Sequence, residues 1–201
     1  MKIKNPIILS MLILGGFAII GSGLSAFVHY QTFEQIKENE YQALLAKLHA
    51  LIPHHIMDNN LIADQIMIKA PELGTNESIV YRARKNNKPV AVIFTPVVPD
   101  GYAGQIKLLV AIKVNGELAG IRVVSHNETP GLGDKVEERK SDWIFSFKGK
   151  SLTNPNSKQW LVKKDGGDFD QFTGATITPR SIVKMVKTTL IYYQQHQAEL
   201  F

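Results

Sequence analysis

The sequence of 201 residues contains no cysteine. This absence excludes disulfide bonds, iron–sulfur clusters held by thiolates, thiol catalysis and zinc–thiolate sites. Redox chemistry in this chain therefore needs an organic cofactor. His54, His55 and His126 do not replace cysteine as ligands, because none has a carboxylate at ligand spacing. We interpret them as surface or loop histidines, and we predict no metal site.

The sequence also lacks a strong excess of charge of one sign. Its formal net charge at pH 7 is +5, from 23 Lys and Arg against 18 Asp and Glu, and the basic residues are scattered. A nucleic-acid interface needs a basic stripe with interleaved aromatic residues, so we expect no nucleic-acid partner. A Ser-His-Asp arrangement, a G-x-x-x-x-G-K loop and a dinucleotide fingerprint are absent as well. No catalytic residue is predicted.

Charged residues are also absent from one long stretch, the run from Ile7 to Val28. About 20 apolar residues span a bilayer core, whereas the apolar part of a secretory signal has about 7–15. We therefore predict an uncleaved transmembrane anchor over residues 7–28. A cleaved signal peptide is the alternative, although Ser25-Ala26 gives a poor cleavage site. Without an ionisable group the span cannot relay an ion by itself, so any transport would belong to partners.

The residues that flank this run predict its orientation. Lys2 and Lys4 precede it, and the acidic residues Glu34 and Glu38 follow it. Because lysine and arginine are enriched on the cytoplasmic side of a span, residues 1–6 are predicted to be cytoplasmic and the bulk of the chain to lie outside the cytoplasm.

The remainder divides into a helical stalk and an α+β domain. Residues 30–51 show a helical pattern that Pro53 ends, and residues 58–64, DNNLIAD, suggest a linker. We assign residues 29–75 to the stalk and linker, and residues 76–201 to the domain.

Within the domain, the chain alternates apolar runs with turn signals. Four strand-like runs cover residues 78–84, 89–98, 106–114 and 118–126. Asn86-Asn87 and Asn115-Gly116 are expected hairpin turns, and the second is the better type I′ signal. Adjacent strands with short loops imply an antiparallel meander. Helices are predicted over residues 135–147 and from Pro179 to about Glu199, so the fold class is α+β.

The segment DQFTGATITPR, residues 170–180, places a cluster of hydroxyl groups just before the last predicted helix. Thr178 with Pro179 suits an N-cap and first-turn pair. The free amide groups of a helix N-terminus favour an anion such as phosphate, and Gly174 and Ala175 leave the neighbouring hydroxyl groups open. The pattern predicts either a site for a phosphate-bearing ligand or merely a well-capped helix.

A second candidate segment is SHNETPGLGDK, residues 125–135, which closes the fourth strand-like run. Pro130 fixes one φ angle, and Gly131 and Gly133 permit positive φ, so backbone amide groups can turn inward. Such a loop can surround a ligand. The alternative is an ordinary tight turn that leaves a strand.

Both segments resemble motifs of one bacterial family. D-Q-F-T-G-A-T at 170–176 is similar to the flavinylation motif D-x-x-[S/T]-G-A-T of subunits of the Rnf and Na⁺-translocating NADH:quinone oxidoreductase complexes. E-T-P-G-L-G at 128–133 is similar to a signature of the same FMN-binding family, and GYAG at 101–104 resembles its Gly-Tyr-x-Gly stretch. The resemblance covers essentially the whole chain. Length and layout look most like the G subunit of the Rnf (also Rsx) complex, and the C subunit of the quinone reductase is its sibling.

The resemblance implies a covalently bound FMN. In the family, the last threonine of the motif carries FMN through a phosphoester bond that a flavin transferase makes from FAD, so the attachment residue here would be Thr176. The ETPGLG loop would bind the pyrimidine edge of the flavin. The other implied cofactor-binding residues are Asp170, Thr173, Gly174, Ala175, Glu128, Thr129, Gly131, Leu132 and Gly133. Arg122 and Lys135 are candidates for stabilising the reduced flavin, with solvated surface charges as the alternative.

The resemblance also implies a function. The chain would be a membrane-anchored electron-transfer subunit, one redox relay rather than a complete enzyme, in an ion-translocating Rnf/Rsx-type complex of the bacterial inner membrane. Its main domain would be periplasmic, and its partners would be other membrane and soluble subunits and the flavin transferase. Two alternatives remain open: an anchored ligand-binding or scaffolding domain without a redox cofactor, and a flavin-containing reductase with a soluble substrate.

Overall fold

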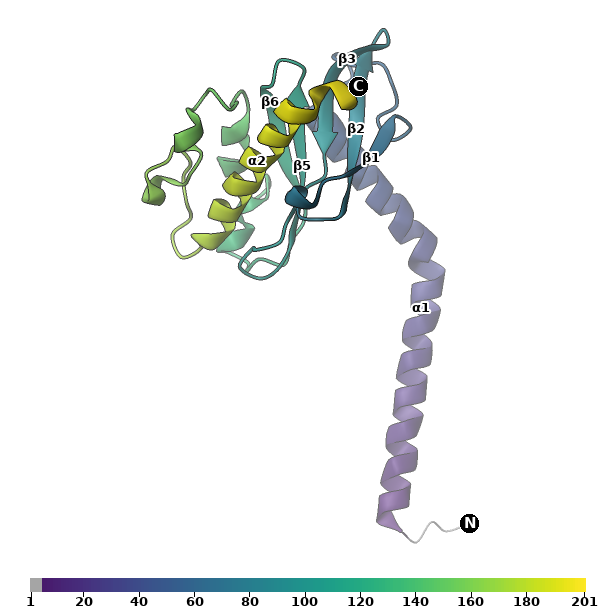
Figure 1. Ribbon diagram of the computed structural model, residues 1–201. Helices are drawn as coiled ribbons and strands as arrows, with labels where there is room; N and C mark the ends of the chain where they lie inside the picture. The colour runs from purple at the N-terminus through teal and green to yellow at the C-terminus, as the bar shows by residue number, and fades with distance from the viewer. Residues whose placement is uncertain (1–4) are drawn as a thin grey trace. The chain divides into compact units, whose positions relative to one another are not determined.

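The computed structural model of the chain describes residues 5–201 (Figure 1). Lys2 and Lys4, on which the predicted orientation partly depends, lie outside the described residues. The chain divides into two units, Met1–Leu45 and Ala46–Phe201. The sequence placed the start of the domain at residue 76, whereas the compact unit begins at Ala46.

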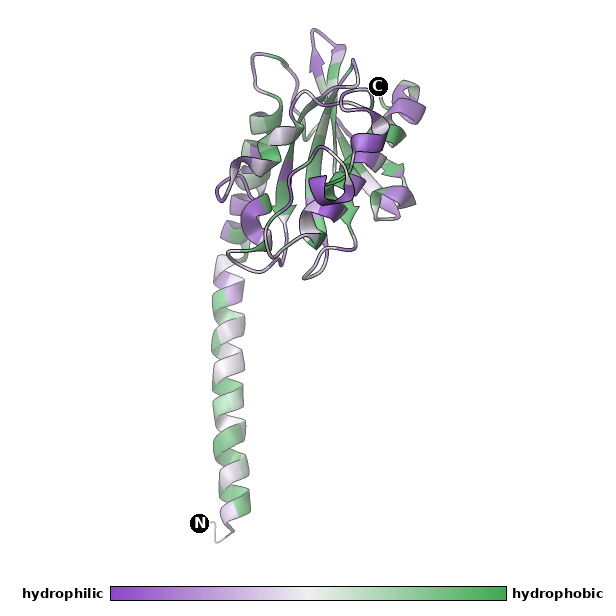
Figure 2. Cartoon of the chain, turned by 90° about the vertical axis from the view of Figure 1, so that its left-hand side faces the viewer, coloured by the Kyte–Doolittle hydropathy of each residue, from purple (hydrophilic) through white to green (hydrophobic). Residues whose placement is uncertain are grey.

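The first helix, α1 (Pro6–Leu51), contains the uncharged run. Its start is set by Pro6, whose fixed φ suits a first turn, and by the Asn5 side chain, which accepts the Ile7 N–H at 3.0 Å. The apolar window of α1 is long enough to cross a membrane and is entirely exposed, and Figure 2 shows hydrophobic turns along it. By length and composition α1 is consistent with a single-pass anchor.

The second unit is built on a six-stranded sheet in which every pairing is antiparallel. The strands are β1 (Gln65–Lys69), β2 (Glu77–Lys85), β3 (Lys88–Phe94), β4 (Val97–Val98), β5 (Ile106–Lys113) and β6 (Leu118–Ser125). β5 pairs with β3 and β4 along one edge and with β6 along the other. β3 and β4 are two pieces of the run predicted at 89–98, so the predicted antiparallel meander is confirmed.

The type I′ turn forms at the other hairpin from the one that the sequence favoured. Asn86 and Asn87 both have positive φ, 50° and 62°, which is the conformation of a type I′ turn. At the other hairpin only Gly116 has positive φ, 83°, and its N–H donates to the Lys113 carbonyl at 2.8 Å. Asn115-Gly116 therefore belongs to a longer turn, and its prediction as the better type I′ signal is wrong.

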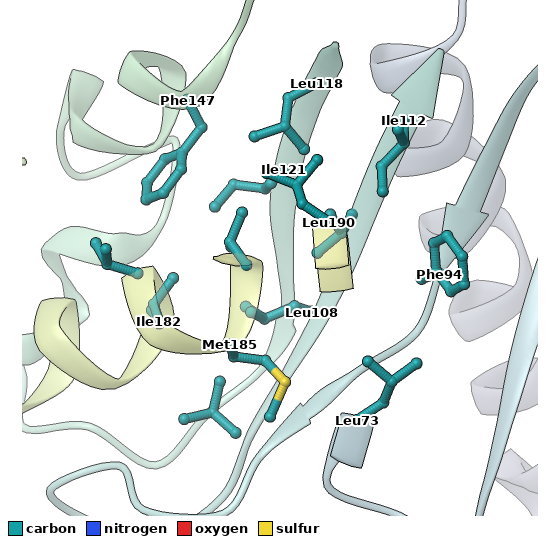
Figure 3. Packing of buried hydrophobic residues seen from close by; sticks show 14 of the residues in the cluster. Leu73, Phe94, Leu108, Ile112, Leu118, Ile121, Phe147, Ile182, Met185 and Leu190 are labelled. Carbon is teal, nitrogen blue, oxygen red and sulfur yellow. The ribbon is translucent and has the colours of Figure 1, made fainter. Parts of the chain in front are cut away.

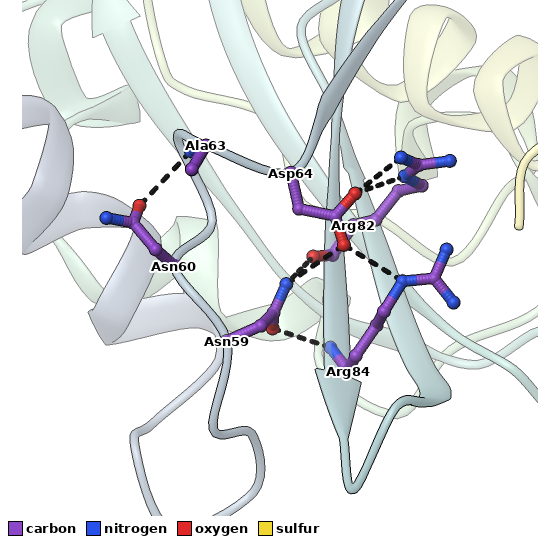
Figure 4. Close-up of polar contacts among 6 residues, drawn as sticks. All are labelled: Asn59, Asn60, Ala63, Asp64, Arg82 and Arg84. Carbon is purple, nitrogen blue, oxygen red and sulfur yellow. Dashed lines mark hydrogen bonds and ion pairs between the residues drawn. The ribbon is translucent and has the colours of Figure 1, made fainter.

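Residues 58–64, which the sequence suggested as a linker, are instead fixed to β2 (Figure 4). The Asp64 carboxylate accepts from the Arg82 Nε at 2.6 Å and from the Arg84 Nε at 2.9 Å. The Asn59 amide donates to the Arg82 carbonyl at 2.8 Å and accepts from the Arg84 N–H at 2.7 Å. The segment leads directly into β1, a strand that the sequence did not reveal.

No α-helix forms over residues 135–147, so that prediction is wrong. Two short 3₁₀ helices, η2 (Gly133–Val136) and η3 (Asp142–Phe147), take its place. They are separated at Ser141, which is extended and whose hydroxyl group accepts the Trp143 N–H at 3.2 Å. This local cap competes with a continuous helix.

The last helix, α2 (Ile177–His196), covers one face of the sheet. Figure 3 shows Ile182, Met185 and Leu190 of α2 beside Leu108 and Ile121 of β5 and β6. The remaining short helices are η1 (Pro71–Leu73), η4 (Ser157–Gln159), η5 (Lys163–Asp165) and η6 (Gln197–Glu199).

The other face of the sheet is covered by the end of α1 and the segment after it. Leu48, Leu51, Ile52 and Leu61 are buried there, and a side chain added at Gly120 of β6 would meet Leu51. The predicted α+β fold, an antiparallel sheet with flanking helices, is thereby confirmed.

Candidate functional site

The threonine segment forms a tight turn just before α2. The Ala175 N–H donates to the Phe172 carbonyl at 3.1 Å, and Gly174, at the third position, has a φ of +83°. A type II turn requires positive φ at that position, which glycine adopts without strain. The turn leaves Thr173 and Gly174 exposed and leads to Thr176, which is half-buried.

Helix α2 begins at Ile177, two residues before the predicted start. Thr176 occupies the N-cap position with helical dihedral angles, φ −76° and ψ −30°, and its side chain caps no N–H group. Within residues 5–201 the Thr176 hydroxyl group has no hydrogen-bond partner. Thr178, the predicted N-cap, is instead fully buried in the first turn, so that prediction is wrong.

Glu128 joins two of the segments that the resemblance singled out to the first turn of α2. Its side chain is buried, with 4% of the residue exposed. Oε2 accepts the Thr178 hydroxyl group at 2.5 Å, and Oε1 accepts the Ala103 N–H at 3.1 Å. One carboxylate thus holds together the ETPGLG loop, the GYAG stretch and the first turn of α2.

Three motif glycines allow these segments to approach closely. A Cβ atom at Gly133 would lie 2.6 Å from Glu128 Oε2, and one at Gly101 would lie 3.0 Å from Glu128 Oε1. A Cβ at Gly174 would lie 3.3 Å from Leu132 Cδ2. The threonine turn and the ETPGLG loop are therefore neighbours, as the resemblance implies.

The ETPGLG loop is a compact turn around one carbonyl group. The Thr129 carbonyl accepts the N–H groups of Leu132 and Gly133, both at 3.1 Å, and Gly131 has a φ of +80°. A hydrogen bond from the Gly131 N–H is the main cause that holds the pKa of the buried Asp134 carboxyl group below its usual value. These contacts fix the loop from within.

His126 fixes the same loop from outside. Its Nδ1 accepts the Glu128 N–H at 3.0 Å, and its Nε2 lies 2.8 Å from Glu137 Oε1. Because a backbone N–H can only donate, Nδ1 must be unprotonated, and Nε2 carries the hydrogen that is donated to Glu137. The bond with His126 is the first cause that lowers the pKa of the Glu137 carboxyl group. His126 therefore lies in a loop, as the sequence suggested, but it has a carboxylate partner that the sequence spacing did not reveal.

We expect His126→Ala to loosen the loop at Glu128. The loss of one hydrogen bond costs about 1 kcal/mol, so exchange of the Glu128 amide hydrogen should accelerate about fivefold. His126→Asn offers an acceptor to the same N–H and should retain most of the protection. Hydrogen exchange measured by mass spectrometry distinguishes the two, with His55→Ala as the control on an exposed histidine. Equal exchange in all variants would show that His126 does not hold the loop.

The charged residues near the threonine segment are engaged elsewhere. Asp170 is exposed and pairs with Lys163 at 2.6 Å, while its carbonyl accepts the Trp143 Nε1–H at 2.8 Å. Arg180 forms two bonds to Asp165, at 2.6 and 2.9 Å. Through its main chain, Asp170 therefore fixes the start of the threonine segment to Trp143.

Arg122 does not lie with the threonine segment. It pairs with Glu138 and stacks over the Phe145 ring at 4.8 Å, beside residues at the end of α1 on the face of the sheet opposite α2. The interpretation of Arg122 as a residue near the flavin is not supported, whereas Lys135 lies within η2, two residues after the end of the ETPGLG loop.

Tyr102 is a candidate that sequence reasoning left out. Its side chain is 68% exposed although it directly precedes Ala103, whose N–H binds Glu128. The Gly-Tyr-x-Gly stretch was the signal for it. With Leu132, which is 41% exposed, Tyr102 places an exposed apolar side chain beside the loops.

The arrangement fits a flavin mononucleotide. A free hydroxyl group stands at a helix N-terminus, where phosphate is favoured. Glycine-rich loops that a Cβ atom would crowd lie beside it, and exposed apolar side chains are available for a ring. In residues 5–201 no cluster of three or more His, Asp or Glu is placed to hold a metal ion.

Comparison with known proteins agrees with this geometry. Residues 101–191 match the family described as FMN-binding domain, and residues 1–51 match the RnfG N-terminal region. The chain is 51% identical to the G subunit of the ion-translocating oxidoreductase complex of Shewanella oneidensis, over 98% of this chain and 94% of that protein. It is 48% identical to the equivalent protein of Vibrio atlanticus and 45% identical to that of Pseudoalteromonas atlantica, over 98% of this chain and 94% and 91% of those proteins. The chain therefore belongs to the family of G subunits of the ion-translocating oxidoreductase (Rnf) complexes, and residues 101–191 are its FMN-binding domain.

Proposed function

We propose that this chain is the membrane-anchored electron-transfer subunit of an ion-translocating oxidoreductase complex, with FMN joined to Thr176 through a phosphoester bond. The observation that carries the proposal is the contrast between neighbouring threonines. Thr178 is buried and donates to Glu128 at 2.5 Å, whereas the Thr176 hydroxyl group is half-buried and bonds to nothing in the described part of the chain.

Attachment at Thr176 is chemically balanced by transfer from FAD. The Thr176 oxygen would attack the phosphorus atom of the FMN half, the phosphoanhydride bond of FAD would break, and AMP would leave as the hydroxyl proton is released. A transferase must supply the catalytic groups, because no general base lies within hydrogen-bond reach of the hydroxyl group among residues 5–201. The free N–H groups of the first turn of α2 would then face the phosphate.

Bound FMN would supply the electron chemistry, and the residues of this chain would position it. Thr176 would fix the phosphate end. Leu132 and Tyr102 would offer apolar contact to the ring, and the amide groups of the ETPGLG loop would bind its polar edge. Glu128 holds the ETPGLG loop, the GYAG stretch and the first turn of α2 together through its hydrogen bonds to Thr178 and Ala103.

The proposed topology places residues 1–6 in the cytoplasm, residues 7–28 in the bacterial inner membrane and the FMN-binding domain in the periplasm. The helical stretch from residue 29 would lead from the span to the domain. Other subunits of the complex would be the electron donor and acceptor, and they would carry the ion, because the apolar run of α1 has no ionisable group.

The attachment is tested on the wild-type chain produced with and without the flavin transferase. After denaturing electrophoresis, a band that fluoresces under ultraviolet light is expected only with the transferase. Peptide mass spectrometry should then place one FMN, less one water, on the peptide that contains Thr176. Colourless protein in both preparations would instead favour the anchored scaffolding domain.

The topology is tested separately, using the absence of cysteine. In a Lys164→Cys variant the only thiol sits on an exposed residue of the domain. A maleimide that cannot cross the inner membrane should label it in intact cells with a permeable outer membrane. Labelling only after lysis would place the domain in the cytoplasm.

A further inference from the structure

A cavity of about 460 Å³ lies on the face of the sheet opposite α2. Its floor is formed by small residues of two strands, Ala91 of β3 with Ala119 and Gly120 of β6. Ala91 and Gly120 alternate with Val92 and Ile121, which belong to the core beneath α2, so they face the other way. The cavity is therefore separate from the flavin site, and its volume is typical of small-molecule sites.

The walls of this cavity are apolar. On one side they are formed by Leu51, Ile52, Pro53 and Ile56, and on the other side by Ile144 and Phe145. Two large apolar side chains remain uncovered at the opening, with 36% of Ile56 and 41% of Phe145 exposed. An apolar body that entered the cavity would cover both.

Leu51 packs directly on the backbone of Gly120 at one wall of the cavity. A Cβ atom there would lie 3.1 Å from Leu51 Cδ2, so a larger residue would collide with the wall. Where the cavity lies, the strands carry only the small residues Ala91, Ala119 and Gly120 on this part of the floor.

The charge of the lining has one sign. Its titratable residues are His55, Lys113, Arg122 and Lys148, and none is acidic. Arg122 is paired with Glu138, and Lys113 pairs with the exposed Glu117 at 3.2 Å. Lys148 is exposed and has no ion-pair partner in residues 5–201, so its ammonium group remains available to a ligand.

We propose that this cavity binds an amphiphilic anion, with its apolar body in the hollow and its single carboxylate or phosphate group beside Lys148. The two parts of the ligand correspond to two features of the cavity: apolar walls with exposed Ile56 and Phe145, and a purely basic set of titratable residues. Free fatty acids and lysophospholipids share this chemistry. The proposal does not depend on the attachment of FMN.

The test uses the full chain in nanodiscs of phosphatidylcholine and a palmitate that carries a photoreactive diazirine on its chain. After irradiation, peptide mass spectrometry is expected to find adducts within residues 51–56 and 144–145. The corresponding long-chain alcohol, which lacks the charge, should label these peptides about two- to fivefold less. Competition by unlabelled palmitate or by lysophosphatidylglycerol then shows whether a carboxylate or a phosphate head is preferred.

Two variants connect the labelling to the cavity. Ala119→Trp fills the hollow and should reduce labelling of these peptides at least tenfold, whereas Ala119→Ser should leave it unchanged. Lys148→Glu alters only an exposed residue and should reduce palmitate labelling about two- to fivefold without affecting the alcohol. Adducts confined to residues 7–28, equal labelling by the alcohol, or labelling that neither variant changes would overturn the proposal.

Discussion

Thr176→Ala is expected to abolish covalent flavin completely while leaving the fold intact. The phosphoester needs the Thr176 oxygen, and alanine removes it. The side chain caps no N–H group and packs at a half-buried position, so its truncation should change the free energy of unfolding by no more than about 0.5 kcal/mol. In-gel fluorescence after co-expression with the transferase measures the flavin, and thermal unfolding measures the fold.

Two matched variants separate attachment from the other roles of this segment. Thr173→Ala removes an exposed hydroxyl group from the same turn and should keep full fluorescence. Thr176→Ser keeps the oxygen and should keep part of it. A fluorescent band of unchanged strength in Thr176→Ala would move the attachment to another threonine.

Gly133→Ala is expected to destabilise the domain by about 2–6 kcal/mol. The new Cβ atom would lie 2.9 Å from Glu128 Cβ and 2.6 Å from Glu128 Oε2, so the carboxylate must move. Overpacking costs about 1–3 kcal/mol. A buried Thr178 hydroxyl group left without its acceptor costs about 1–3 kcal/mol more. Because three segments separate when Glu128 moves, flavin attachment should fall as well.

Gly131→Ala is the matched control, because it strains the backbone of the same loop without crowding a neighbouring residue. A Cβ atom at Gly131 would meet nothing within 4 Å, but its φ of +80° strains any other residue by about 1–2 kcal/mol. Thermal unfolding of protein made without flavin, followed by the fluorescence of Trp143 and Trp160, compares the two. If Gly131→Ala proved the more damaging, backbone conformation rather than close packing would govern the loop.

The strands were predictable because each carries a local pattern. β2, β3, β5 and β6 are runs of β-branched and apolar residues between turn residues, and such residues are enriched in strands. The run at 89–98 breaks in the structure because Pro96 has no N–H for the ladder, which separates β3 from β4. β1 was missed because Gln65 and Lys69 frame a short segment in which no residue is fully buried.

The predicted helix over 135–147 failed for a different reason. Its charged and aromatic residues have a helical composition, but Ser141 stops a helix there with its own side chain. The aromatic residues of this segment differ in burial. Trp143 and Phe147 are buried in the core, while Phe145 is 41% exposed on the other side.

The proposed attachment segment could be found only through the resemblance, because spacing alone allowed a simple helix cap. Local sequence patterns could not identify the carboxylate that holds the site together. Glu128 lies 50 residues before its partner Thr178, so the sequence around either residue does not predict the contact. Arg122 was misplaced because it alternates with Ile121 and Val123, which belong to the core beneath α2, so its side chain faces the opposite side of the sheet.

The last turn of α1 has a consequence for the order in which the chain becomes structured during its synthesis. Leu48 and Leu51 are core residues, and the Lys47 ammonium group donates to the Val123 carbonyl at 2.8 Å, across 76 positions of sequence. The helix therefore leaves the ribosome well before β6, the strand that contacts the end of the helix. Until β6 emerges, these leucines remain uncovered, and contacts of such long range close slowly. A membrane-inserted N-terminal helix would hold the nascent chain in place during that interval. Delays in translation between residues 51 and 125 should prolong most the time for which the uncovered leucines are exposed to proteolysis.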